Sequence, residues 1–368
     1  MLTRLYIDNF KCFVNFEYKP ARRNLILGRN GSGKTSFIDA LLALREFLTK
    51  GGNAEDCFPL QQRTRWLNQA KQTFEMDVAL NDGTYSYSLV IELAGEPSKP
   101  RVLSETLQFN EKRILDLDCG QAKIYNEAFE PTASLRVTSE RSVLAAFGQV
   151  TENRTLRQFS QWIDGLLCSR IDPFAMTGLA QGEVRHPNVD LSNIAAWYRY
   201  LDRTSPDDVP KLRESLSSAI EDLRLLKLEP REENIELLVA EFSERPASRF
   251  RFTFSELSDG QRCLICLYVI LHFVLSKGKT VIIDEPENFI SLAEIQPWLM
   301  AVTDSIEEGH GQILLISHHP ELINQWAANH GVQFVRDGVG SVLVEPFPAN
   351  SYSTLPPAEL VARGWERG

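Results

Sequence analysis

Residues 28–35, GRNGSGKT, have the residue types and the spacing of a loop that binds phosphate groups. Glycines allow successive backbone N–H groups to surround a phosphate, and a lysine ammonium reaches the terminal phosphate oxygens. The hydroxyl after the lysine can join the coordination shell of Mg²⁺. We therefore predict that this loop binds ATP with Mg²⁺, with Lys34 stabilising charge and Thr35 binding the metal. The expected ATP-binding residues are Gly28, Arg29, Asn30, Gly31, Ser32, Gly33, Lys34, Thr35 and Ser36.

An apolar run that ends in carboxylates, TVIIDEPEN at 280–288, supplies the second chemical group. Asp284 is expected to hold Mg²⁺ through water. Glu285 is expected to act as the general base that polarises the attacking water. Glu287 is a third carboxylate whose role stays open.

A second apolar run with a polar end, ILLISHHPEL at 313–322, follows at the distance expected for neighbouring parallel strands. A histidine at this end can hydrogen bond to the γ-phosphate or to the attacking water. We predict that His318 is this catalytic γ-phosphate sensor, and the adjacent His319 is the alternative.

The stretch FSELSDGQRC, residues 254–263, predicts a helix start whose backbone N–H groups attract an anion. The expected nucleotide contacts here are Ser258, Gly260 and Gln261. One phosphate loop already surrounds the phosphates from one side, so a second anion-binding helix start within the same chain would be redundant. We therefore expect two copies to face each other head to tail, with each signature stretch closing over the ATP held by the other copy.

The elements that must position these residues can be predicted from hydrophobic periodicity. Strands are expected over 2–27 and over 73–126, with turns at 81–83 and 118–120, and a helix is expected to begin at Lys34. Helical spacing predicts helices within 142–149, 156–167, 193–201 and 209–226. Further strands are expected at 234–242, 249–254, 280–285 and 312–317.

This order predicts an α/β fold with a parallel phosphate-loop sheet, an antiparallel β lobe and a helical insertion. We divide the chain into an N-terminal half with the phosphate loop and the β lobe (1–138), a helical insertion (139–227) and a C-terminal half with the remaining motifs (228–368). The strand RFRFTF at 249–254 has two interpretations: an aromatic and basic nucleic-acid surface, or a half-buried strand with a solvated arginine face. The second is favoured.

The net charge of −10 weighs against general binding to polyanions, although DNA stays a candidate partner. The longest apolar run, 263–275, is shorter than the roughly 20 residues that cross a bilayer. The N-terminus lacks the pattern of a signal peptide. We therefore expect a cytoplasmic protein without a membrane partner.

Together the motifs resemble the head of ABC-type ATPases: GRNGSGKT its Walker A, LSDGQ at 257–261 its signature, VIIDEPEN its Walker B and SHH at 317–319 its switch histidine. The start LYIDNFKCF and the SDGQ and DEPEN variants resemble the SMC and RecF-like branch, especially stand-alone OLD-like ATPases of anti-phage defence operons. The resemblance implies an ATP-hydrolysing homodimer that controls a separate effector, a nuclease or a toxin, from the same operon.

Three features depart from the family pattern. Ile290, Ser291 and Leu292 stand where relatives commonly have Leu, His and Pro, which puts the D-loop contact in doubt. The Q-loop glutamine is not assigned, with Gln61, Gln62 and Gln149 as the options. The segment after the histidines is short for the nuclease domain of OLD proteins, so any nuclease is expected to be another chain.

Three alternative functions share these motifs. One is a RecF-like DNA-repair ATPase that clamps duplex DNA, and salt-dependent DNA binding that rises with ATP would reveal it. Another is the nucleotide-binding subunit of a membrane transporter, which the NFKCF and DEPEN variants disfavour. The third is a scaffold that binds ATP without turnover.

Overall fold

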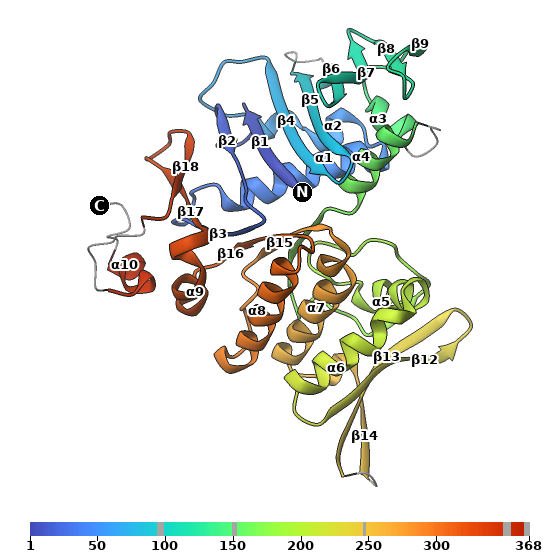
Figure 1. Ribbon diagram of the computed structural model, residues 1–368, viewed down its shortest axis with the longest axis vertical. Coiled ribbons are helices and arrows are strands. Elements are labelled where there is room, and N and C mark those ends of the chain that lie inside the picture. The colour runs from blue at the N-terminus through green and yellow to red at the C-terminus, as the bar shows by residue number, and fades with distance from the viewer. Residues whose placement is uncertain (94–98, 149–152, 246–247, 349–354, 364–368) are drawn as a thin grey trace. The chain divides into compact units, whose positions relative to one another are not determined.

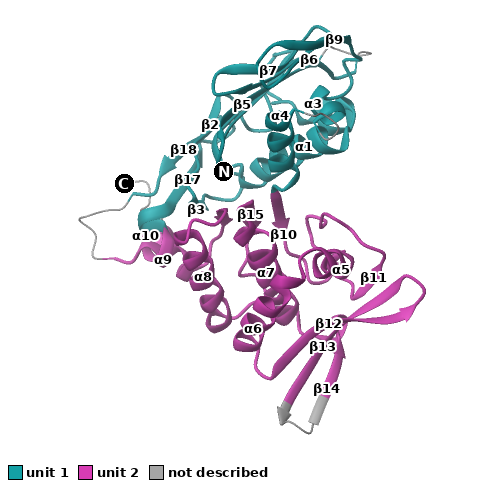
Figure 2. Cartoon of the chain, turned by 45° about the vertical axis from the view of Figure 1, so that its right-hand side comes forward, with its two compact units in different colours: residues 1–166, 327–352, 366–368 teal, residues 167–326, 353–365 magenta. Residues whose placement is uncertain are grey.

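The computed structural model describes residues 1–93, 99–148, 153–245, 248–348 and 355–363. The chain divides into two compact units, which Figure 2 colours separately. Unit 1 comprises residues 1–166, 327–352 and 366–368, and unit 2 comprises residues 167–326 and 353–365. The motifs identified above are shared between the units, so each unit is described by itself.

Unit 1 contains an antiparallel sheet in which eight strands follow the order β2-β1-β4-β5-β6-β7-β8-β9 (Figure 1). The alternation of buried and outward residues along β4 and β5 explains their pairing, because one face of each strand is apolar. The strands are β1 (Leu2–Asp8), β2 (Phe16–Tyr18), β4 (Lys71–Leu80), β5 (Gly83–Glu92), β6 (Arg101–Phe109), β7 (Lys112–Asp118), β8 (Gln121–Tyr125) and β9 (Pro131–Arg136).

Unit 1 also contains the strand that leads into the phosphate loop. Strand β3 (Arg23–Leu27) pairs in parallel with β17 (Gly331–Arg336), which pairs antiparallel with β18 (Val342–Pro346). Buried aromatic rings support these strands, with Phe334 of β17 in edge contact with Phe16, Tyr18 and Phe37. The helices of this unit are α1 (Lys34–Lys50), α2 (Ala54–Cys57), η1 (Leu60–Gln62), α3 (Val143–Phe147) and α4 (Arg154–Asp164), and α9 (Pro320–His330) contains the division between the units.

Unit 2 contains three parallel strands with buried, apolar sequences: β10 (Leu167–Arg170), β15 (Thr280–Asp284) and β16 (Gln312–Ile316). Parallel strands need a crossover connection, and α8 provides one between β15 and β16. Helices α6, α7 and α8 pack on one another, and the buried Trp298 of α8 donates its indole N–H to the Leu267 carbonyl of α7 at 3.0 Å. The helices are α5 (Ile194–Thr204), η2 (Pro206–Asp208), α6 (Val209–Ala219), η3 (Phe254–Glu256), α7 (Asp259–Phe273), η4 (Leu275–Lys277), α8 (Leu292–Glu307) and α10 (Pro357–Arg363).

A second sheet of unit 2 is antiparallel. Its strands are β11 (Leu179–Gln181), β12 (Leu223–Glu232), β13 (Ile235–Arg245) and β14 (Ser248–Thr253). The long strand β13 pairs with all three of the others. Strand β14 leads through η3 directly into α7, so this sheet positions the start of the signature helix (Figure 1).

The α/β fold with a parallel sheet and an antiparallel β lobe is confirmed. The expected turns at 81–83 and 118–120 join β4 to β5 and β7 to β8. The segment 139–227 was expected to be a helical insertion. It contains helices, but the strands β10 and β11 also lie within it. The helix predicted over 209–226 is wrong at its end, because α6 stops at Ala219, Asp222 adopts a positive φ of 60° and β12 begins at Leu223.

The favoured interpretation of the 249–254 segment was half right. It forms the predicted strand β14, and Arg251 on its solvent side pairs with Glu229 and Glu241. The aromatic face is only partly covered, however, since Phe254 is buried whereas Phe250 is 51% exposed and Phe252 is 41% exposed. Packing around this strand, which local alternation does not encode, leaves both rings at the surface.

The apolar run at 263–275 lies within a helical stretch, Asp259–Lys277, that has the length and mean hydropathy (1.3) of a membrane span. This stretch is 67% buried within the protein. Buried core helices have the same composition. Helix α7 therefore packs as a core helix of unit 2, as predicted.

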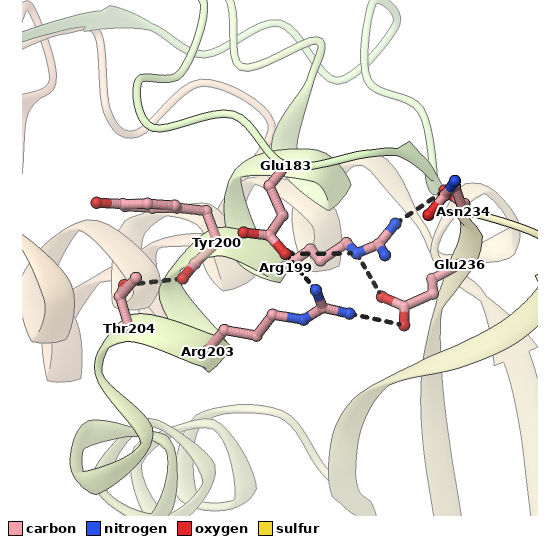
Figure 3. Close-up of polar contacts among 7 residues, drawn as sticks. All are labelled: Glu183, Arg199, Tyr200, Arg203, Thr204, Asn234 and Glu236. Carbon is pink, nitrogen blue, oxygen red and sulfur yellow. Dashed lines mark hydrogen bonds and ion pairs between the residues drawn. The ribbon is translucent and has the colours of Figure 1, made fainter.

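An ion-pair network fixes helix α5 against strand β13 (Figure 3). Arg199 of α5, 8% exposed, pairs with Glu236 at 2.9 Å and donates to the Asn234 carbonyl at 2.8 Å. Arg203, one helical turn later and 50% exposed, pairs with Glu236 at 3.5 Å and with Glu183. The burial difference predicts that Arg199 carries most of the stabilisation.

We expect Arg199→Met to lower the free energy of unfolding by about 1–3 kcal/mol, because it removes the 2.9 Å ion pair with Glu236 and the 2.8 Å hydrogen bond to the Asn234 carbonyl from a largely buried position. Glu236 keeps its contact with Arg203, and the Asn234 carbonyl keeps the hydrogen bond from the Gly182 N–H. The matched control Arg203→Met removes a solvent-screened cation from the same network and should cost less than about 1 kcal/mol. Urea unfolding of both variants measures the difference. Equal losses would show that the network acts as a surface feature.

Candidate functional site

The phosphate loop of unit 1 runs from the end of β3 to the start of α1 and contains all of the predicted ATP-binding residues from Gly28 to Ser36. Its backbone turns through left-handed conformations at Gly28 (φ 153°), Gly31 (φ 81°) and Gly33 (φ 101°). The Ser32 N–H donates to the Arg29 carbonyl at 3.1 Å, which closes the turn. The loop therefore has the curved backbone that a phosphate cradle requires.

Two of these glycines are also needed for close packing. A Cβ at Gly28 would lie 2.5 Å from Ser32 Oγ and 2.7 Å from the Phe334 carbonyl oxygen. A Cβ at Gly33 would lie 3.0 Å from Val342 Cγ2 and 3.1 Å from Cys12 Sγ. The lack of room for a Cβ atom and the positive φ therefore both favour glycine at these positions.

The loop fits a bound phosphate on two independent observations. Ser32 is 4% exposed, yet its Oγ is buried without a hydrogen-bond partner among the described residues. Helix α1 begins after Gly33 without a side-chain cap and without an acidic residue in its first turn. An anion at this helix end would satisfy the hydroxyl and the first N–H groups together.

The Lys34 ammonium lies over this loop and donates to the Gly28 carbonyl at 2.5 Å and to the Arg29 carbonyl at 3.2 Å. Thr35, the predicted metal ligand, is exposed at the start of α1. Arg336 of β17 donates to the Gly31 carbonyl at 3.3 Å and lies over the ring of Trp66, 5.3 Å from its centroid. Sequence reasoning missed this arginine, because only the pairing of β3 with β17 brings it to the loop.

In unit 2, Asp284 is the last residue of β15 and is 8% exposed. Its Oδ2 accepts hydrogen bonds from Arg170 Nε at 2.8 Å and Nη2 at 2.5 Å. Arg170 ends β10, the strand paired in parallel with β15, and the two residues are register partners. Sequence reasoning missed Arg170. A cation that ends an apolar run, LLCSR, was the signal that could have found it.

Glu285 follows in a left-handed backbone conformation with φ 52°. This conformation is uncommon for a residue with a side chain and costs energy that its surroundings must supply. The Glu285 N–H donates to the Ile316 carbonyl at 2.8 Å, which ties the turn to the end of β16. Such a fixed turn holds the carboxylate at the end of the strand.

Glu287 has a different environment from Glu285. It is 7% exposed, and its carboxylate accepts a hydrogen bond from Ser317 Oγ at 2.5 Å. Burial raises the pKa of Glu287, and the Ser317 hydrogen bond opposes this rise. The geometry indicates a positioning carboxylate that holds the histidine-bearing loop.

The two histidines after β16 are also held differently. The backbone N–H of His319 donates to Ser317 Oγ at 2.9 Å, and its Nδ1 accepts from the Glu321 N–H at 3.2 Å, which caps α9. His318 is exposed. The ring of His319 is thus engaged in the local fold through Nδ1, and the exposure of His318 makes its ring accessible to a ligand.

The signature stretch of unit 2 forms a capping box at the start of α7. Ser258 Oγ accepts from the Gln261 N–H at 3.2 Å, and Gln261 Oε1 accepts from the Ser258 N–H at 3.1 Å. Asp259 pairs with Arg262, so its charge is neutralised locally. The capping box leaves the N–H groups of Asp259 and Gly260 for another acceptor.

Gly260 packs against the segment that follows Walker B. A Cβ at this position would lie 2.7 Å from the Phe289 carbonyl oxygen. Phe289 has a positive φ of 69°, is 50% exposed, and contacts the 72% exposed Phe174 edge-on. Unit 2 therefore brings the signature, Walker B and histidine segments into direct contact, while the phosphate loop belongs to unit 1.

We expect Gly260→Ala to lower the free energy of unfolding by about 1–3 kcal/mol, because the methyl group must displace a backbone carbonyl. This exceeds the gain of up to about 1 kcal/mol that alanine brings to a helix. Thermal unfolding without nucleotide measures the effect. A variant as stable as the parent protein would show that Gly260 is not required for packing.

The residues that depart from the family pattern after Walker B, and the candidate Q-loop glutamines, have structural roles or lie at the surface. Ser291 caps α8 through a capping box with Glu294, Ile290 is buried and Leu292 is 45% exposed. Gln61 and Gln62 lie in η1 of unit 1, where the Gln62 carbonyl accepts from the Lys11 N–H at 2.6 Å. Gln149 lies outside the described residues.

Residues 23–324 match the family described as "AAA domain, putative AbiEii toxin, Type IV TA system". The chain belongs to this family. No curated protein matches the sequence of this AAA-family chain.

Solved structures with a similar fold are heads of SMC proteins. An SMC head bound to the C-winged helix domain of ScpA aligns with TM-score 0.58 and 13% identity, covering 94% of this chain and 98% of that one. The SMC head with a coiled coil and joint from Pyrococcus yayanosii aligns with TM-score 0.54 and 10% identity, covering 99% of both chains. An SMC head with an extended coiled coil from Pyrococcus furiosus, bound to the C-terminal domain of ScpA, has TM-score 0.51 and 12% identity, covering 100% and 98%. This AAA-family chain thus has the fold of an SMC-type ATPase head.

Proposed function

We propose that this AAA-family chain binds and hydrolyses ATP with Mg²⁺. The observation that carries the proposal is the phosphate loop, in which Ser32 Oγ is buried without a hydrogen-bond partner among the described residues and α1 begins without a side-chain cap. A phosphate would supply oxygen acceptors to the hydroxyl and to this helix end. The family and the SMC-type fold support the same conclusion. The domain division 1–138, 139–227 and 228–368 remains part of the proposal.

Each residue of the site has a chemical role in this proposal. Lys34 stabilises the charge that develops on the γ-phosphate, and Glu285 accepts a proton from the attacking water. His318 hydrogen bonds to the γ-phosphate. Thr35 and Asp284 would hold Mg²⁺, which neutralises phosphate charge when it is bound.

The proposal includes a head-to-tail homodimer with two composite sites. The signature stretch supports it, since the N–H groups of Asp259 and Gly260 have no partner within the capping box and Ser258 is exposed. A hydroxyl that accepts from Gln261 still has its own proton to donate to an anion. A second copy that presents ATP would supply that anion.

Mixing two inactive variants tests this arrangement. Lys34→Ala damages the phosphate loop, and Ser258→Arg blocks the signature stretch, so each variant alone should lack activity. In a mixed dimer, the loop of the Ser258→Arg copy meets the intact signature of the Lys34→Ala copy. Phosphate release should therefore return to about a quarter of the wild-type rate, since half of the dimers are mixed and each has one intact site.

Recovery no greater than the sum of the separate variants would contradict a composite site. The variant Thr253→Ala is the control for the stability lost with a helix cap. Thr253 forms the same kind of capping box with Glu256 at the start of η3. Each cap loss should cost about 1 kcal/mol of stability. Only the Ser258 variant should lose ATP turnover.

We further propose that closure on ATP controls a separate effector, a nuclease or a toxin, in anti-phage defence. The family description, which names a toxin of a type IV toxin–antitoxin system, supports this role. Capture of an effector that depends on ATP, and is lost with Lys34→Ala, would test it. DNA affinity that rises with ATP and falls steeply with salt would instead favour a RecF-like DNA clamp.

A further inference from the structure

A groove of about 570 Å³ lies in unit 2 beside the signature helix. Its apolar lining includes three phenylalanines, Phe242 of β13 and Phe250 and Phe252 of β14, together with Ile220 and Leu257. The rings of Phe242 and Phe252 meet edge-on, 5.6 Å apart, and half of the Phe250 side chain is open to solvent. An exposed apolar surface of this kind is hydrated unfavourably, so covering it with an apolar group of a partner lowers the free energy.

Carboxylates surround the same groove. Glu221 and Asp222 lie between α6 and β12, Glu256 ends η3, and Glu294 lies in the first turn of α8. Hydrogen bonds from Thr253 lower the pKa of Glu256, which keeps that carboxylate ionised. Among the lining residues that the structure describes there is no lysine, arginine or histidine. An occupant must therefore combine apolar groups with positive charge.

The charges of the described residues disfavour nucleic acid in this groove. Phosphates would meet the carboxylates, and the nearby Arg251 already pairs with Glu229 and Glu241 at 3.6 and 3.2 Å. A second copy of the chain, with its net charge of −10, is also a poor match for an acidic rim. A basic partner protein is the occupant that the charges favour.

Strand β14 adds a second feature. Among the described residues it pairs only with β13, so it is an edge strand of this sheet (Figure 1). An edge strand offers unpaired N–H and C=O groups to another extended segment. The partner can therefore be a short extended segment, whose main chain pairs beside the groove while its side chains enter it.

We propose that this groove is the docking site for an extended segment of a partner protein in which apolar side chains alternate with lysines and arginines. The segment places its apolar side chains on Phe242, Phe250 and Phe252, and its cations meet the carboxylate rim and the ring faces. The groove is separate from the phosphate loop, and of the predicted nucleotide contacts in the signature stretch it includes Gln261.

The groove also reaches the signature helix. Leu257 and Gln261 are among its lining residues, and Gln261 Oε1 forms the capping box with Ser258. A docked segment therefore contacts the side chain that fixes the start of α7. Docking and the conformation of the signature stretch are linked through this one residue.

Fluorescence anisotropy with synthetic peptides tests the proposal on the full chain. The probe is a labelled ten-residue peptide in which Leu and Phe alternate with Lys and Arg. We expect saturable binding with a dissociation constant on the order of 10 µM, weakened by added salt. One comparison peptide carries Glu and Asp in place of the cations, and another carries Ser in place of the apolar residues. Neither should bind.

Variants of the groove separate docking from general stickiness. Phe252→Ser and Phe250→Ser should each weaken peptide binding at least about tenfold, because each ring becomes buried under the peptide in the complex. Glu221→Lys should reduce both the affinity and its salt dependence. The matched control Leu343→Ser removes a side chain that is 57% exposed on β18 of unit 1, and binding should be unchanged.

Several results would overturn the proposal. They are equal binding of the acidic peptide, binding that both phenylalanine variants retain, or absence of binding by the basic apolar peptide. A change in the mass of the ATP-bound protein caused by Phe252→Ser would assign the groove to a second copy instead. Thermal unfolding of each variant, expected to be unchanged because the substituted side chains are exposed, confirms that folding is preserved.

Discussion

Lys34→Ala is expected to weaken ATP binding at least a hundredfold and to abolish phosphate release. The Lys34 ammonium lies 2.5 Å from the Gly28 carbonyl and 3.2 Å from that of Arg29, at the loop that we propose binds the phosphates. A hydrogen bond to a charged group contributes about 1.5–3 kcal/mol, so the loss of two to the phosphates corresponds to at least about a hundredfold in affinity. Titration with a fluorescent ATP analogue measures the change.

The chain offers a matched control at the other end of the same helix. Lys50 lies in the last turn of α1 and is exposed. Lys50→Ala removes the same charge from a position where it contributes only a few tenths of a kcal/mol to the helix. ATP affinity should stay within a factor of about two. If both variants bind ATP like the parent protein, the loop does not hold the nucleotide.

Glu285→Gln is expected to retain ATP but to slow phosphate release by about 10²–10⁴-fold. Glutamine has the shape of glutamate and bears the left-handed φ of 52° at a similar cost, but it cannot accept a proton from water. ATP-bound dimers should therefore accumulate. Size-exclusion chromatography with light scattering, with and without ATP, measures the mass.

Glu287→Gln provides the comparison. Its amide oxygen can still accept the Ser317 hydrogen bond, so the histidine loop should stay in place and the rate should fall far less. If this variant loses as much activity as Glu285→Gln, the roles of the two carboxylates are exchanged. If Glu285→Gln stays monomeric with every nucleotide, the head-to-tail dimer is wrong.

Local signals in the sequence were sufficient for most of the phosphate loop and its flanking elements. Glycine spacing and the apolar face after Lys34 predicted where β3 ends and α1 begins, and Gly51 stops the helix at φ 65°. The turns at 81–83 (Asn, Asp, Gly) and 118–120 (Asp, Cys, Gly) contain residues that favour hairpins. Such features depend on neighbours along the chain.

Features that depend on distant strands could not be predicted. The Arg170 contact with Asp284 requires the register of β10 on β15, which are more than one hundred residues apart. The end of α6 was mispredicted because Leu223 suits both a helix face and a buried strand position. Exposure of Phe250 and Phe252 likewise follows from what packs around β14, not from its alternation.

The close approach of Gly28 to the Phe334 carbonyl, and of Gly33 to Val342, has a consequence for biosynthesis. The ribosome makes the glycine turn early, but the strands that brace it emerge some three hundred residues later. We therefore expect that nascent chains do not retain nucleotide until β17 and β18 have emerged, and such long-range closure is slow. Premature termination before β17 would yield products that a nucleotide-affinity resin does not retain.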